Sequence, residues 1–144
     1  MEQVVNRSHV IQELQELLNR NIAVEDFPYR KGNSIRIGKY AIRKKQKEFI
    51  IIDCKTNKII DQCFSQAAAI AVTKKLAAGV DVSLTEIKRL DQNLMKNYVD
   101  CIFYSHTIEN TKDEFKRSAT LDRYDIAKNR VEDATHALES HIFR

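Results

Sequence analysis

Residues 82–144 constrain the fold most, because they indicate two long helices that each have their own start signal. The first signal pairs Ser83 with Glu86 at capping-box spacing, in which each side chain bonds the backbone amide of the other residue. Mostly apolar residues then recur at steps of three and four, the spacing of one helix face. They are Ile87, Leu90, Leu94, Tyr98, Cys101, Ser105 and Ile108. We therefore predict a helix over residues 84–109.

The second start signal is Thr111 with Glu114, again at capping-box spacing, with Asp113 and Glu114 near the positive end of the helix dipole. We predict a helix over residues 112–142. Its apolar seam is formed by Tyr124, Ala127, Val131, Ala134 and Leu138. Because the connection is so short, two antiparallel neighbours are the expected arrangement, and a single bent helix is the alternative.

This helical hairpin has more apolar surface than it can bury on itself. The first helix, of about 27 residues at about 1.5 Å each, is roughly 40 Å long, whereas residues 1–81 should form a body with a radius of gyration of about 12 Å. Residues 101–104 leave no polar side at one turn. A third element must therefore cover that turn, either the N-terminal body or a second copy of the chain, and we expect both to contribute. The predicted interface residues are Leu94, Met95, Tyr98, Ile102, Phe103, Tyr104, Val131 and Leu138.

The first half of the chain predicts a small α+β domain over residues 1–81. We expect a helix over residues 7–20, capped by Asn6 or Ser8, then strands within residues 34–64, and an alanine-rich helix over residues 65–78. A loop over residues 22–33 is expected to carry Ile22, Phe27 and Tyr29 onto the core.

Residues 49–52 are apolar on both faces, which is typical of a central strand covered on both sides. The alanine-rich helix should cover one face of the sheet, and the first helix or the base of the hairpin the other. The predicted fold class is thus α+β, with a three- to four-stranded antiparallel sheet flanked by helices and followed by a long C-terminal antiparallel helical hairpin. We expect residues 1–81 and 82–144 to form one compact unit.

The residues that usually carry catalysis or metal binding do not form a recognisable pattern. The three cysteines contain no CxxC pair, which predicts reduced and mostly buried thiols. His9, His106, His136 and His141 are not at metal-ligand spacing. The three glycines are far apart, so there is no phosphate-binding loop. We expect a protein that is not an enzyme and holds neither a cofactor nor a metal.

Positive charge concentrates in residues 34–63, which contain eight Lys or Arg against three acids, whereas the whole chain carries a formal net charge of +4. Basic residues interleaved with Tyr40 and Phe49 on a strand hairpin over residues 36–58 suit a sheet that contacts phosphates. The candidate nucleic-acid-binding residues are Arg36, Lys39, Arg43, Lys44, Lys45 and Lys47. The alternative is that these charges only prevent edge-to-edge aggregation of the sheet.

No stretch approaches the roughly 20 apolar residues of a membrane span, and the first residues lack the order of charged, apolar and small residues found in a signal peptide. We therefore expect no membrane association and a cytoplasmic or virion setting.

Several stretches resemble a small protein family encoded by marine tailed phages. They are residues 34–40 (SIRIGKY), 63–69 (CFSQAAA) and 100–107 (DCIFYSHT), with residues 123–128 (RYDIAK) similar too. The resemblance covers most of residues 34–144 and brings no assigned activity with it. It implies the host cytoplasm or the virion as the setting, with a virion or host protein as a further candidate partner.

Two functions follow as expectations. The leading one is a non-enzymatic phage-type accessory or structural protein that self-associates, or docks to a larger assembly, through its helical arm. The alternative is a nucleic-acid-binding module that uses the basic strand hairpin.

Overall fold

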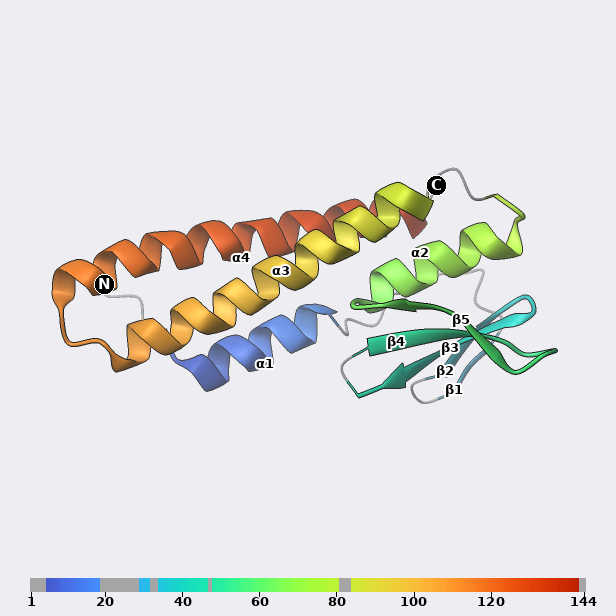
Figure 1. Cartoon of the computed structure of the whole chain (residues 1–144), viewed down its shortest axis with the longest axis horizontal. Coiled ribbons are helices and arrows are strands. Elements are labelled where there is room, and N and C mark those ends of the chain that lie inside the picture. The colour runs from blue at the N-terminus through green and yellow to red at the C-terminus, as the bar shows by residue number, and fades with distance from the viewer. Residues whose placement is uncertain (1–4, 19–28, 32–33, 47, 81–83, 143–144) are drawn as a thin grey trace.

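The computed structural model describes residues 5–18, 29–31, 34–46, 48–80 and 84–142. The helices among them are α1 (Arg7–Leu18), α2 (Gln66–Ala77), α3 (Leu84–Asn110) and α4 (Glu114–Ile142). The strands are β1 (Tyr29–Lys31), β2 (Ser34–Ile37), β3 (Tyr40–Lys45), β4 (Glu48–Asp53) and β5 (Lys58–Cys63). Figure 1 shows α3 and α4 side by side along the length of the molecule, with the sheet at one end. The predicted α+β class with a C-terminal antiparallel hairpin is confirmed.

The sheet is an antiparallel meander in which the strands lie in sequence order from β1 to β5. The predicted strand region supplies β2 to β5. A further edge strand of three residues, β1, forms where we expected a loop and pairs with β2. Gly38 adopts a positive φ of 58° in the turn between Ile37 and Tyr40, a conformation that costs glycine little. The expected placement of Ile22 and Phe27 lies outside the described residues.

Helix α2 fills the space between the sheet and the base of the hairpin. It contacts strands β2 to β5 on one side and both α3 and α4 on the other. Residues 67–73 are all buried, because a helix covered on both sides has no solvent-facing stripe. The small alanine side chains let the sheet and the hairpin approach α2 closely, so the alanine-rich composition suits this middle layer.

Helix α1 packs against α3 and α4, alongside the part of the hairpin between its loop and the sheet (Figure 1). It therefore does not cover the second face of the sheet, which was one of the two predicted arrangements. Val10 and Leu14 are buried in one cluster with Cys101, Tyr124 and Val131 of the hairpin. The Arg7 amide also donates a hydrogen bond of 3.0 Å to the Glu109 carboxylate. The apolar side chains of α1 are therefore buried against the hairpin.

A salt bridge supports the same packing on the polar side of α1. The Lys128 ammonium of α4 lies 2.8 Å from the Glu13 carboxylate of α1. This pair raises the pKa of Lys128 above its ordinary value, against the opposing effect of burial. The far half of the hairpin is thus part of a three-helix arrangement.

Two of the predicted helix caps can be compared with the structure. The Asn6 side chain accepts the Ser8 amide at 2.9 Å, which confirms Asn6 as the cap of α1. The cap of α4 is Asp113, whose Oδ1 accepts the Phe115 amide at 3.0 Å, so the predicted box based on Thr111 is wrong. Asp113 is the better cap because its charge also faces the positive end of the helix dipole. Ser83 lies outside the described residues.

No helix in the described part of the chain is both long and apolar enough to cross a membrane.

Candidate functional site

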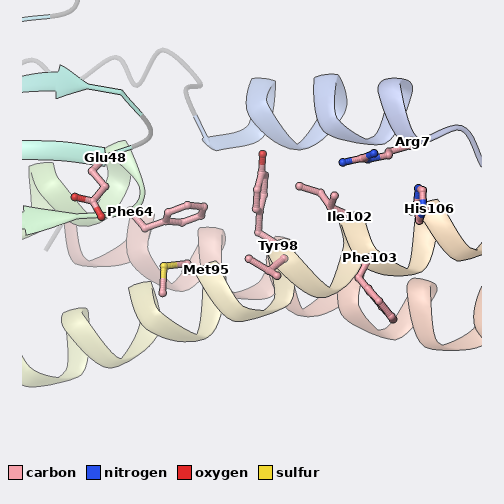
Figure 2. Close-up of a pocket in the computed structure, with 9 residues that line it drawn as sticks. Arg7, Glu48, Phe64, Met95, Tyr98, Ile102, Phe103 and His106 are labelled. Atoms are coloured by element: carbon pink, nitrogen blue, oxygen red, sulfur yellow. The ribbon is translucent and has the colours of Figure 1, made fainter.

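A groove of about 560 Å³ runs along α3, between α1 and the edge of the sheet. Figure 2 shows the labelled side chains around it, drawn from α1, β4, the β5–α2 junction and α3. The lining residues are Arg7, Glu48, Phe64, Met95, Tyr98, Val99, Ile102, Phe103 and His106. The groove is thus mostly apolar, with charged residues among its lining.

The floor of the groove joins the two buried clusters that the described residues form. Tyr98 packs against both of them, and its ring meets the Phe64 ring edge to face at a centroid distance of 5.2 Å. Burial raises the pKa of the Tyr98 hydroxyl above its ordinary value. This aromatic pair therefore connects the groove to both buried clusters.

The outer side of the groove is an unusual run of exposed apolar side chains on α3. Met95 is 43% exposed, Val99 is 56% exposed and Phe103 is 63% exposed. They are four residues apart and therefore lie on one side of the helix. We refer to Met95, Val99 and Phe103 as the α3 stripe. Large apolar side chains gathered in this way on a surface usually mark a contact with another molecule.

Opposite charges stand at the two ends of the groove. Arg7, the first residue of α1, lies beside His106 at the end nearer the hairpin loop (Figure 2). Glu48, the first residue of β4, lies at the end nearer the sheet. A molecule bound along the groove would therefore meet a basic group at one end and an acidic group at the other.

The structure divides the predicted interface residues into three groups. Met95, Tyr98, Ile102 and Phe103 line the groove, and half-buried Tyr104 packs against the α1 cluster. The other three, Leu94, Val131 and Leu138, are fully buried inside the chain, so their assignment to a surface interface was wrong. They lie on the α3 and α4 faces that meet each other and the rest of the core.

Five groove-lining residues were not predicted as contact residues: Val99, Arg7, Glu48, Phe64 and His106. Val99 could have been found, because it lies four residues from both Met95 and Phe103 and thus on the same side of a helix. Arg7 and Glu48 carried no such signal, since only the folding of α1 and β4 toward α3 brings them to one groove.

A polar cluster lies at the neighbouring junction of β5, α2 and α3. The Lys88 ammonium bonds the Asp61 carboxylate and the Gln62 carbonyl oxygen, both at 2.6 Å. Burial raises the pKa of the adjacent Cys63 thiol to about 12, and the Asp91 charge adds to the effect. A thiol held in its protonated form is a poor nucleophile. This cluster therefore joins structural elements and lacks an activated group.

The strand pairing separates the candidate nucleic-acid-binding residues. Arg36 faces Ala41, and Arg43 faces Ile50, on the sheet face turned away from α2. Lys45, two residues after Arg43, lies on that same face. In contrast, Lys44 lies over the Phe49 ring on the α2 side, 5.7 Å from its centroid, and Lys39 lies 5.4 Å from the Tyr40 ring centroid. Lys47 lies outside the described residues.

Within the described ranges, no three His, Cys, Asp or Glu residues are grouped so that they could hold a metal ion. His141 is buried, and its Nε2 lies 3.7 Å from the Glu86 carboxylate. The other histidines, His9, His106 and His136, are exposed on helices.

Comparison with known proteins finds no matching family model, no matching curated protein and no matching solved structure. The resemblance to a phage-encoded family therefore stays a prediction.

Proposed function

We propose that this chain is a non-enzymatic accessory or structural protein, of the phage type that its sequence resembles, which associates through the helical arm formed by α3 and α4. The contact surface is the groove with the α3 stripe, and the partner is a second copy of the chain or a component of a larger assembly. The observation that carries this proposal is the exposure of Met95, Val99 and Phe103 on one side of α3. Removing such a surface from water is the main favourable term in most protein association.

Both the charged ends and the aromatic floor of the groove support association more than catalysis. Arg7 and Glu48 stand at the groove ends, where charged groups at the edge of an interface set the orientation of a partner. The floor is formed by the Phe64–Tyr98 pair and by Ile102. Aromatic residues are common in the centres of protein interfaces.

The proposal is tested by measuring the mass of the protein in solution across a concentration series by sedimentation velocity. We expect reversible association that Val99→Asp weakens by about tenfold or more, because it places a charge within the apolar contact. Ile126→Asp is the matched control, since Ile126 is 52% exposed on α4, away from the groove. Two results together would refute the proposal. The wild type would stay monomeric at every concentration, and its Val99→Asp variant would capture the same assembly components as the wild type.

We propose nucleic-acid binding as the second candidate function, because strand alternation gathers Arg36, Arg43 and Lys45 on one sheet face. All three are exposed. Basic side chains on a sheet face can follow a phosphate backbone without reading its sequence. Lys44 and Lys39, in contact with aromatic rings, would contribute less.

This second function is tested by binding to random-sequence DNA and RNA over a range of salt concentrations. We expect an affinity that falls steeply with salt and is lost when Arg36, Arg43 and Lys45 are all changed to Glu. The control changes Lys112, Lys116 and Arg117 to Glu, which alters the net charge equally at an exposed site near the start of α4. Absence of binding at low salt, or an equal loss in both variants, would exclude this sheet face as a specific binding surface.

A further inference from the structure

We propose that the occupant of the groove is a second copy of this chain, bound with its α3 antiparallel to the first on a two-fold axis that passes beside Val99. This inference rests on the proposed association through the groove and adds the identity of the partner and the geometry of the contact. Two independent features support it. They are the spacing of the α3 stripe and the positions of Arg7 and Glu48, the end charges, at opposite ends of the groove.

The α3 stripe has the same spacing in both directions from its centre. Met95 lies four residues before Val99, and Phe103 lies four residues after it. A two-fold axis at Val99 therefore places Met95 of each copy beside Phe103 of the second copy, and Val99 beside itself. In a two-fold interface one surface patch must be complementary to itself, and this stripe meets that condition.

The end charges favour the same antiparallel arrangement. Arg7 and Glu48 line opposite ends of one groove (Figure 2). When α3 is reversed, Arg7 of each copy approaches Glu48 of the other, so that symmetry creates two equivalent ion pairs. A parallel arrangement would instead bring like charges together, which disfavours that alternative.

The size of the surface indicates a weak dimer. The part of α3 from Met95 to His106 is about 17 Å long, at about 1.5 Å per residue. A contact of this length with flanking contributions from α1 and β4 is at the small end of protein interfaces. We therefore expect reversible association that depends on the end charges as well as on the stripe.

Cysteine cross-linking tests the geometry directly. The background is Cys54→Ser, because Cys54 is exposed whereas Cys63 and Cys101 are buried. We expect Val99→Cys to form an intermolecular disulfide with itself under mild oxidation, since residues on the axis come closest to their own copies. A Met95→Cys protein should cross-link efficiently only when it is mixed with a Phe103→Cys protein, because a disulfide needs Cα atoms about 4.4–6.8 Å apart.

A charge exchange tests the second feature. Arg7→Glu and Glu48→Arg should each weaken dimerisation by about threefold to tenfold, as expected for the loss of two pairs at an interface edge. The double variant Arg7→Glu with Glu48→Arg should recover most of the wild-type affinity, because the pairs form again with reversed signs. Sedimentation velocity measures all three dissociation constants, and circular dichroism checks that the helices remain folded.

The outcomes separate this inference from the proposed function. If the chain associates and Val99→Asp prevents it, but Val99→Cys does not cross-link or Met95→Cys cross-links to itself, the groove is used in another geometry and the antiparallel pairing is refuted. Failure of the charge exchange to recover affinity also counts against it. If the chain is monomeric and its groove binds a different protein, the second copy is excluded while the proposed function stands.

Discussion

The Ser65 hydroxyl donates a hydrogen bond of 2.8 Å to the Asp91 carboxylate of α3, and its oxygen also accepts the Ala68 amide at 3.2 Å as the cap of α2. The backbone amides of Phe64 and Ser65 donate to the same carboxylate at 2.6 and 3.0 Å. Asp91 is buried. One side chain of the hairpin thus fixes the junction between β5 and α2, and with it the position of Phe64 in the groove.

Asp91→Ala should lower the free energy of unfolding by about 2–4 kcal/mol, because the amides of Phe64 and Ser65 lose their acceptor in a buried place. Urea denaturation followed by circular dichroism measures this change. Asp122→Ala is the control, since Asp122 is exposed on α4 and its loss should cost less than about 0.5 kcal/mol. Equal stability of the two variants would contradict the role given to Asp91.

The same carboxylate should give the protein a specific pH dependence. Burial raises the pKa of Asp91 above its ordinary value, although the hydrogen bonds from Phe64 and Ser65 oppose the shift. The native state therefore holds this proton more tightly than the unfolded chain does. As pH falls from neutral to about 4, the free energy of unfolding gains a contribution from Asp91, because the native group protonates before the unfolded one.

Asp91→Asn removes this titrating group while keeping one oxygen acceptor. We expect the stability of the wild type, relative to Asp91→Asn, to increase as the pH is lowered over that range in urea denaturation experiments. A constant difference between the two proteins, or a wild type that becomes relatively less stable toward acid pH, would show that the pKa is not raised.

Substitutions before α4 test whether Asp113 or Thr111 caps the helix. Asp113→Ala should destabilise the protein by about 1 kcal/mol, because its Oδ1 accepts the amides of Phe115 and Lys116. Thr111→Ala should have little effect, although its sequence spacing to Glu114 indicated a capping box. Thermal and urea denaturation of both variants measure the comparison, and a larger loss at Thr111 would reverse the assignment of the cap.

The cysteines should differ sharply in reactivity. Cys54 is exposed, whereas Cys63 and Cys101 are buried. Burial raises the pKa of both buried thiols to about 12, with added effects of the Asp91 charge on Cys63 and of the Asp100 charge on Cys101. Iodoacetamide should therefore modify only Cys54 in the native protein near neutral pH, because the thiolate is the reactive form.

Mass spectrometry of intact and digested protein identifies the modified thiols. All three should react after unfolding in guanidinium chloride, which shows that the reagent itself is not limiting. Rapid native modification of Cys63 or Cys101 would mean that the β5–α2 junction or the centre of the hairpin opens far more often than this packing implies.

Local sequence patterns were enough to find most elements of the fold. Apolar residues recur at steps of three and four along α3, so its predicted bounds lie close to the observed ones, and Asn6 marks the start of α1. The run of residues 49–52, apolar on both faces, likewise located the central strand β4. Strand β1 has only three residues, too few for a periodic pattern, and was therefore missed.

The candidate site was predicted less well, because an apolar pattern shows that a helix face is buried without showing what buries it. Leu94 and Met95 are adjacent in the sequence and equally apolar, yet Leu94 is fully buried in the core and Met95 is 43% exposed in the groove. Their directions differ by about 100° around the helix. The choice between core and surface depended on where α1, α2 and α4 packed around α3.

The sequence by itself determined the helices, the strands of the meander and the long hairpin, since hydrophobic periodicity and capping act over a few residues. The tertiary structure alone decided that α1 packs on the hairpin and that Arg7 and Glu48 stand at the ends of one groove. The physical reason is that burial of apolar area is non-directional. Several elements of the chain could bury the apolar side of α1, and the geometry of the whole chain selects among them.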